Sequence, residues 1–242
     1  MSPNQNAVCR SWYERSYGHG GFAAQRRYPN EELLRFFGRH YFPLSQAQRR
    51  QIRVLEAGCG SGANLWMIAR EGFDAHGIDL SPAAVNLCTK MLNARGARAT
   101  VKVADMTTPP PYPDRHFDAI LDVFSAYCLD ETDFGRFLDE VTRLLRPGGR
   151  FFCYTPSKAS DAFKNPGRSK KLDRSTLDGI RRKTSPFFGN LYPFRFTTGK
   201  ELGKALRARK LRVVYDETAG RSYRSGREYF EFVVMVAEKP GA

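Results

Sequence analysis

The chain has 242 residues, which suits one large domain or a domain with an appendage. It carries 39 Lys and Arg against 25 Asp and Glu, a formal net charge of +14, so it should attract anions: nucleic acid, phosphorylated or carboxylated molecules, or an acidic membrane surface. The absence of a long apolar run excludes a spanning helix, and five widely spaced cysteines without a C-x-x-C pair indicate neither a zinc site nor a disulfide framework. With no signal-peptide core at the N-terminus, we expect a metal-free cytoplasmic protein.

Residues 1–51 precede the main fold pattern and are expected to form a helical cover. An aromatic stretch containing Tyr13 and Tyr17 starts a short helix, which the glycines of segment 18–21 should break. Asn30 then caps a helix over 31–39 that has acidic residues in its first turn.

Residues 52–62 predict a buried strand followed by a glycine-rich turn. Three glycines stand at every second position, Gly58, Gly60 and Gly62, and a segment with helical spacing follows. Unpaired N–H groups at such a helix start favour negative or strongly polar groups of a nucleoside-like ligand.

A second strand is predicted to end at Asp79, about 20 residues beyond the glycine turn. A carboxylate in that position can accept hydrogen bonds from ribose hydroxyls. Gly58, Gly60 and Ala63 also satisfy the dinucleotide pattern G-x-G-x-x-A, so a nicotinamide cofactor is an alternative. Glu56, placed to face a cationic ligand, and Asp105, at the end of a third strand over 99–104, argue against it.

Strand and helix signals alternate over residues 52–155, as in a parallel doubly wound sheet. The fourth strand is expected over 117–123, a helix over 131–145 and the fifth strand over 150–155. Two further strands, over 211–215 and 230–237, follow a helix that Thr197 or Thr198 caps.

Residues 156–195 break this alternation and are strongly basic. Within 157–183, nine Lys or Arg stand against three Asp, a net charge of +6. A long connection at the carboxyl edge of a sheet is typically a functional loop, so we expect a basic lid that selects the acceptor molecule.

The chain resembles the class I S-adenosylmethionine-dependent methyltransferases of the small-molecule type. The segments that carry the resemblance keep the family's order over roughly residues 50–155: Val54-Leu55-Glu56-Ala57-Gly58-Cys59-Gly60-Ser61-Gly62, Gly77-Ile78-Asp79-Leu80-Ser81, Ala104-Asp105-Met106, Phe117-Asp118-Ala119-Ile120 and Leu144-Leu145-Arg146-Pro147-Gly148-Gly149. The resemblance implies an α/β fold with a doubly wound, seven-stranded Rossmann-like sheet, mostly parallel with an antiparallel last strand. It also implies a methyltransferase domain over 52–242 and S-adenosylmethionine as cofactor.

Ten positions are assigned to the cofactor by this resemblance. The glycine turn passes under its amino-acid part, Glu56 organises the turn, Asp79 binds the ribose, and the strand-end residues line the adenine and methionine portions. The ten are Glu56, Gly58, Cys59, Gly60, Asp79, Leu80, Asp105, Met106, Asp122 and Val123.

The acceptor and any general base are not identified by the sequence. His19 and Tyr127 are weak catalytic candidates, and the acceptor side is assigned to Tyr13, Tyr17, Tyr127, Tyr192 and Arg195. The interpretation we favour is O- or N-methylation of a small, polar, anionic metabolite. RNA methylation, for which the net charge argues, a non-catalytic S-adenosylmethionine-binding protein and an NAD-dependent oxidoreductase remain alternatives.

Overall fold

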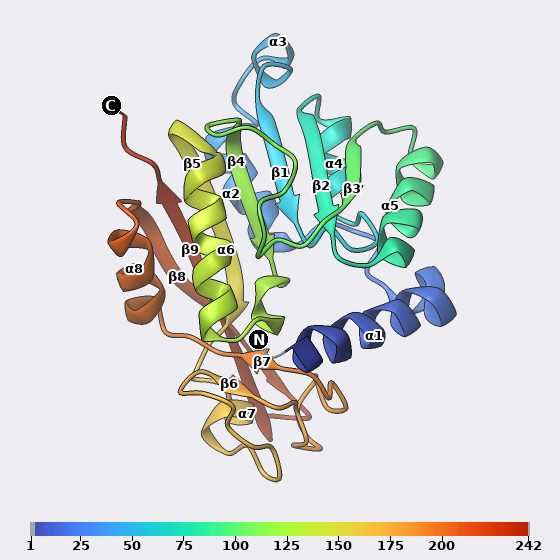
Figure 1. Cartoon of the computed structure of the whole chain (residues 1–242), viewed down its shortest axis with the longest axis vertical. Helices are drawn as coiled ribbons and strands as arrows, with labels where there is room; N and C mark the ends of the chain where they lie inside the picture. Colours follow the sequence, from blue (N-terminus) through green and yellow to red (C-terminus); the bar gives the residue numbers. More distant parts are fainter. Residues whose placement is uncertain (1–2, 242) are drawn as a thin grey trace.

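A computed structural model gives the backbone of residues 3–241 and the side chains of 8–18, 20–23 and 25–241 (Figure 1). A seven-stranded sheet in the order β3-β2-β1-β4-β5-β9-β8 forms its centre. The sheet strands are β1 (Arg53–Ala57), β2 (Asp74–Asp79), β3 (Thr100–Val103), β4 (Phe117–Val123), β5 (Leu145–Pro156), β8 (Arg212–Tyr223) and β9 (Glu228–Glu238).

The first five strands run parallel, and β9 is antiparallel to both of its neighbours. Because β1 to β5 point the same way, the turns that follow them gather at one edge of the sheet. The fold class expected from the sequence is confirmed, including the antiparallel strand at the end of the chain.

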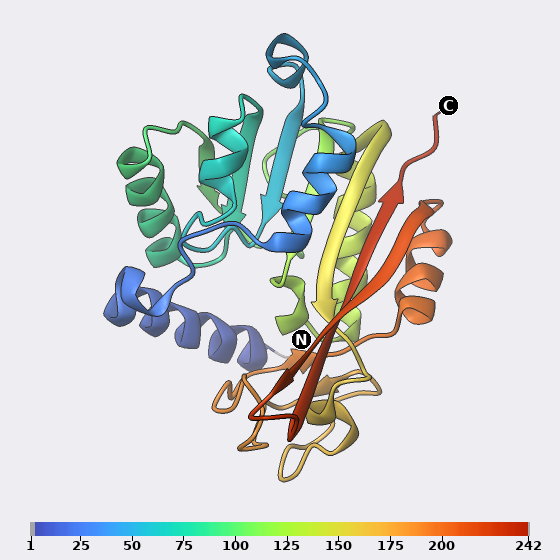
Figure 2. The ribbon, with the colours of Figure 1, turned by 180° about the vertical axis from the view of Figure 1, so that it is seen from behind.

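Helices cover both faces of the sheet, as Figures 1 and 2 show from opposite sides. One face packs against α6 and α8 through residues such as Phe137 and Leu206, and the other against α2, α4 and α5 through residues such as Phe37 and Ile68. The main helices are α1 (Pro3–Gly20), α2 (Glu31–His40), α4 (Leu65–Arg70), α5 (Pro82–Ala94), α6 (Glu131–Leu144) and α8 (Gly199–Ala208). No described helix combines the length and the apolar composition that crossing a bilayer requires.

Polar side chains begin three of these helices where the sequence indicates. Asn30 accepts hydrogen bonds from the backbone N–H groups of residues 32 and 33, Ser81 accepts one from Ala84, and Thr198 forms a capping box with Glu201. These caps fix the chain direction at α2, α5 and α8, and therefore the angle at which each helix meets the sheet.

Two segments lie beyond the carboxyl ends of the parallel strands. Helix α1 crosses there, and residues 157–195 form a layer beside it that contains α7 (Asp161–Lys164) and a small sheet of β6 (Thr176–Leu177) and β7 (Phe194–Arg195) (Figure 1). Helix α1 is longer than the short helix expected around Tyr13, because Gly18 and Gly20 continue it. The basic segment is likewise more ordered than a plain loop, since Leu177, Tyr192, Phe194 and Phe196 form an apolar cluster with Phe230 of β9.

The remaining short helices are connectors. They are η1 (Gly21–Ala24), α3 (Gln46–Arg49) and η2 (Ala126–Cys128). The last of them follows β4 directly and, with residues 124 and 125, shapes the edge described next.

Candidate active site

The turn after β1 can be built only from glycine at its critical positions. Gly58 and Gly60 have φ of +68° and +53°, which L side chains rarely adopt. A Cβ atom on Gly58 would lie 2.4 Å from Cβ of Ser125, and one on Gly60 would lie 2.8 Å from the hydroxyl of Tyr17. The turn therefore brings bare backbone to the strand edge, where Ser125 and Tyr17 pack directly against it.

Asp79, at the end of β2, is tied to this turn. One of its carboxylate oxygens accepts a hydrogen bond from the N–H of Gly60 and the other from the N–H of Ser81, each at 2.9 Å. Burial raises the pKa of Asp79 to about 6 although these two N–H groups oppose the rise. Each carboxylate oxygen keeps a lone pair, so the side chain can still accept hydrogen bonds from a ligand.

Glu56 is a buried carboxylate with one free oxygen. Its side chain is 2% exposed; Oε1 accepts a hydrogen bond from Nδ2 of Asn64, whereas Oε2 is buried without a hydrogen-bond partner among the described atoms. Burial raises the pKa of Glu56 to about 7, against the lowering influence of Asn64 and Arg26. An orphaned acceptor at this depth is expected where a donor or a cation of a ligand completes the site.

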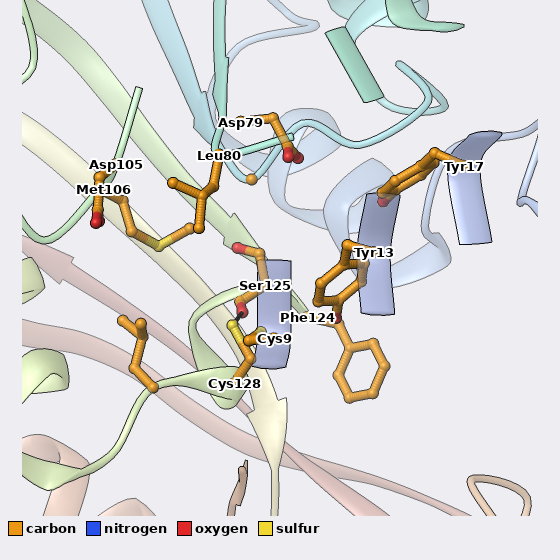
Figure 3. Close-up of a pocket in the computed structure, with 12 residues that line it drawn as sticks. Cys9, Tyr13, Tyr17, Asp79, Leu80, Asp105, Met106, Phe124, Ser125 and Cys128 are labelled. Atoms are coloured by element: carbon orange, nitrogen blue, oxygen red, sulfur yellow. Dashed lines mark hydrogen bonds between the residues drawn. The ribbon is translucent and has the colours of Figure 1, made fainter. Parts of the chain in front are cut away.

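The turns of β1 to β4 line a cavity at the carboxyl edge of the sheet (Figure 3). Asp79, Leu80, Asp105 and Met106 lie on one side of it, and Tyr13 and Tyr17 of α1 lie on the other (Figure 3). The carboxylate of Asp105 accepts hydrogen bonds from the N–H and hydroxyl of Thr107, which hold it in place.

A second, roomier cavity adjoins the first. The two share Tyr13, Tyr17, Gly58 and Phe124 in their walls. The second begins at Glu56 and the glycine turn, and its far end is walled by Trp12, Val123, Tyr127, Phe187, Asn190 and Tyr192. One elongated site thus has a polar end at the strand turns and an aromatic end between α1 and the basic segment.

Three phenol hydroxyls meet at the aromatic end. The hydroxyl of Tyr127 lies 2.8 Å from that of Tyr13 and 2.5 Å from that of Tyr192, and the hydroxyls of Tyr13 and Tyr192 are 3.4 Å apart. Burial, followed by the neighbouring Tyr192, raises the pKa of Tyr127 well above the usual value, although its hydrogen bond with Tyr13 opposes the rise. Burial raises the pKa values of Tyr13 and Tyr192 too. The cluster is therefore protonated at neutral pH, and its O–H groups are turned on one another, so one of them donates to a ligand by exchanging an internal hydrogen bond.

Nine of the ten positions assigned to the cofactor line these two cavities. The exception is Asp122, whose side chain is fully buried in the turn after β4. Its Oδ1 accepts from the N–H groups of Ser125 and Ala126 and from the Ser125 hydroxyl, and its Oδ2 accepts from the thiol of Cys153. Asp122 therefore shapes the turn, and the neighbouring Val123 lies in the cavity wall.

The acceptor-side positions divide in the same way. Tyr13, Tyr17, Tyr127 and Tyr192 line the second cavity, but Arg195 is in neither lining set. Arg195 is 6% exposed, and its guanidinium lies 3.8 Å from the ring centroid of Phe134, so it packs against α6. The side chain of His19 lies outside the described residues, and neither lining set contains a histidine.

Several wall residues carry no sequence signal that we could interpret. Phe124 and Ser125 follow β4, and Phe124 has a left-handed φ of +58° that turns the chain back toward the glycine loop. Arg26 joins the polar end from the segment after η1, where its guanidinium donates to Oδ1 of Asn64. The hydrogen bond between Asn64 and Glu56 could have been suspected from the sequence, because Asn64 stands only eight residues after Glu56. The position of Arg26 beside these two residues is shown only by the fold.

Comparison with known proteins finds a methyltransferase domain within the chain. A family model described as a methyltransferase domain matches residues 54–149. A fatty-acid O-methyltransferase of Mycolicibacterium smegmatis is 36% identical over 132 residues, which is 53% of this chain and 46% of that protein. The chain therefore spans about half the length of this curated relative.

Solved structures support the fold at low sequence identity. A SAM-dependent methyltransferase of Methanosarcina mazei has a TM-score of 0.65 at 21% identity, covering 78% of this chain and 93% of that one. A 1,6-didemethyltoxoflavin-N1-methyltransferase of Burkholderia thailandensis, solved with its substrate and S-adenosylhomocysteine, has a TM-score of 0.63 at 19% identity, covering 99% and 91%.

Proposed function

We propose that this chain, whose matched domain and fold are those of the class I S-adenosylmethionine-dependent methyltransferases, transfers a methyl group to the carboxylate oxygen of an acid with an apolar body. The observation that carries the proposal is the protonated Tyr13–Tyr127–Tyr192 cluster at the aromatic end of a cavity that begins at the glycine turn.

The polar end of the site fits S-adenosylmethionine. The free Oε2 of Glu56 suits its ammonium group, the backbone of Gly58 and Gly60 lies in the cavity wall beside which its amino-acid part would pass, and Asp79 keeps lone pairs for its ribose hydroxyls. Leu80 and Met106 provide apolar walls and Asp105 an acceptor beside them. When bound, S-adenosylmethionine supplies a methyl group on a positively charged sulfur.

The residues of this chain mainly bind, align and exclude water. Methyl displacement needs close and desolvated reactants more than it needs a protein nucleophile. Helix α1 contributes Trp12, Tyr13 and Tyr17 to the roof of the site, where the ring of Trp12 packs 4.8 Å from that of Tyr192. The roof thus joins the helix to the basic segment across the cavity.

The aromatic end favours an acceptor that is already nucleophilic. Among the described residues its walls hold phenols, other aromatic rings and Asn190 but no histidine, and the raised pKa values of the tyrosines make phenolate a poor candidate for a general base. A carboxylate needs no deprotonation at neutral pH, and it accepts hydrogen bonds from neutral phenols. The fatty-acid O-methyltransferase relative supports the same acceptor chemistry.

The net charge of the chain led us to expect a polar metabolite as acceptor. The apolar walls of the cavity instead favour a carboxylic acid with an apolar body. Phe124, Tyr127 and Phe187 would pack against that body, which supports a small molecule over RNA, whose case rests on net charge alone.

The test is methyl transfer from labelled donor to a matched series: hexadecanoic acid, hexadecanol and hexadecylamine. We expect label in a base-labile ester with the acid and none with the alcohol or amine. Tyr127→Phe removes the central hydroxyl and should raise KM for the acid about tenfold, the cost of one hydrogen bond to a charged group, with donor affinity unchanged. Methylation of the amine in preference to the acid, or an unchanged KM in Tyr127→Phe, would refute the acceptor assignment.

A further inference from the structure

The mouth of the aromatic cavity carries side chains that the methyl-transfer site does not use. In the turn over 183–192, Phe187, Asn190 and Tyr192 line the cavity, while Phe188 and Leu191 face away from it. Phe188 is 54% exposed and Leu191 is 49% exposed, so two large apolar side chains stand in water beside the mouth.

This turn is held firmly against the rest of the fold. Nε of Arg182 and the hydroxyl of Thr184 both donate to Oε2 of Glu228, which is fully buried at the start of β9. The ring of Phe187 packs 4.7 Å from that of Phe230. The outward positions of Phe188 and Leu191 therefore belong to an anchored turn.

Cations surround the two apolar side chains. Lys183 is exposed at the start of the turn, and Arg224, at the tip of the β8–β9 hairpin, donates from Nε to the carbonyl of Thr184 while its side chain remains exposed. The acids nearest in the chain are already engaged, because Asp178 pairs with Arg181 and Glu228 with Arg182. The turn over 183–192 therefore presents an apolar tip with a basic border.

We propose that this surface, formed by Phe188, Leu191, Lys183 and Arg224, docks on an anionic lipid bilayer, from which the acceptor enters the cavity. Apolar side chains with adjacent Lys and Arg are the combination that binds at the boundary of headgroups and acyl chains. Phe187, Asn190 and Tyr192 of the same turn line the cavity that holds the tyrosine cluster, so the turn would place such a boundary next to the cavity. The proposal deepens the proposed function, on which its account of substrate entry rests.

Co-sedimentation of the full chain with vesicles tests the docking without any turnover. Vesicles of phosphatidylcholine alone and of an equimolar mixture with phosphatidylglycerol provide the neutral and anionic surfaces. We expect binding to the anionic vesicles, reduced about tenfold in the Phe188→Ser, Leu191→Ser double variant because two apolar contacts are lost. Lys183→Gln and Arg224→Gln should each weaken it about fivefold.

Matched controls separate this surface from general basicity. Val214→Ser removes an apolar side chain that is 40% exposed near the start of β8, and Lys204→Gln removes an exposed cation from α8. Both should bind like the unaltered chain, and thermal unfolding of every variant checks that the fold is intact.

Three outcomes overturn the docking proposal. The chain binds neither kind of vesicle, as it would if its partner were an acidic protein. The control variants lose as much vesicle binding as the surface variants, or the Phe188/Leu191 double variant binds vesicles as well as the unaltered chain. The same experiments distinguish a failure of the docking from a failure of the proposed function. If dispersed hexadecanoic acid is methylated but vesicles are not bound, only the docking proposal is wrong. If vesicles are bound but the acid is not methylated, only the proposed acceptor is wrong.

Discussion

The buried carboxyl of Glu56 makes donor binding depend on pH near neutrality. With a pKa of about 7 in the ligand-free protein, Glu56 is largely protonated in mild acid and largely ionised above neutrality. Its free Oε2 would pair with the ammonium of the ligand, and only the ionised form makes that ion pair. We therefore predict that S-adenosylhomocysteine binds more tightly as pH rises.

The magnitude follows from the ionised fraction. A carboxyl with a pKa of about 7 is ionised in roughly 3% of molecules at about pH 5.5 and in roughly 75% at about pH 7.5, so the apparent affinity should rise about 25-fold over that range. Asp79, with a pKa of about 6, is expected to add a further factor of about 4. The unaltered chain should thus show about a 100-fold change.

Isothermal titration calorimetry at several pH values measures this directly, in a range where the ammonium of the ligand stays protonated. Glu56→Gln preserves the shape of the side chain and its carbonyl acceptor for Asn64, so it serves as the matched variant. It should bind more weakly at the upper end and retain only the smaller change due to Asp79. A flat profile for the unaltered chain, or the same slope in both proteins, would refute the assignment of Glu56 to the ammonium.

Two other predictions concern the same polar end. Gly60→Ala should reduce S-adenosylhomocysteine affinity by more than tenfold and destabilise the fold by about 1 kcal/mol, because the added Cβ meets the Tyr17 hydroxyl and the residue has a left-handed φ. The control is Gly38→Ala in α2, where open space surrounds the added Cβ. This variant should bind normally in the same calorimetry. Binding lost equally in both alanine variants would contradict the close-approach argument. In the ligand-free protein, the pKa of Glu56 lies above its unfolded value of 4.5, so its contribution to stability is present below about pH 4.5 and is lost as pH rises through about 7. By denaturant unfolding, the free energy of unfolding of the unaltered chain should fall by about 2 kcal/mol between about pH 5.5 and 7.5, and Glu56→Gln should abolish this fall. An unchanged pH dependence in Glu56→Gln would show that Glu56 is not the group responsible.

The polar end of the site could be predicted from the sequence because it is local. Gly58, Gly60 and Asp79 follow strands whose apolar patterns are clear, and parallel strands bring their ends to one edge. Caps such as Ser81 were predictable for the same reason: the cap and the N–H group that it satisfies lie within three residues. Position along a short segment was enough to place each of these side chains.

At the aromatic end the tyrosines were assigned from the sequence, but their mutual arrangement could not be predicted because it depends on distant packing. Tyr13, Tyr127 and Tyr192 come from three segments that no local pattern joins, and only the fold shows that their hydroxyls meet. Asp122 shows the converse, since a strand-end carboxylate looks like a ligand-binding group until its oxygens are found bonded to the following turn. Arg195 was assigned to the acceptor side from the sequence, but the fold packs its guanidinium on the ring of Phe134.

The two ends of the site are built from different parts of the chain, and this division has an evolutionary consequence. The turns that would hold the methyl donor follow β1 to β4, whereas the roof comes from α1 and the far wall from residues 157–195 together with Tyr127 of η2. Mutation or exchange of those two outer segments can therefore retune which molecule is accepted without disturbing the sheet. A chimera that grafts both segments together onto a sister enzyme should carry its selectivity with them.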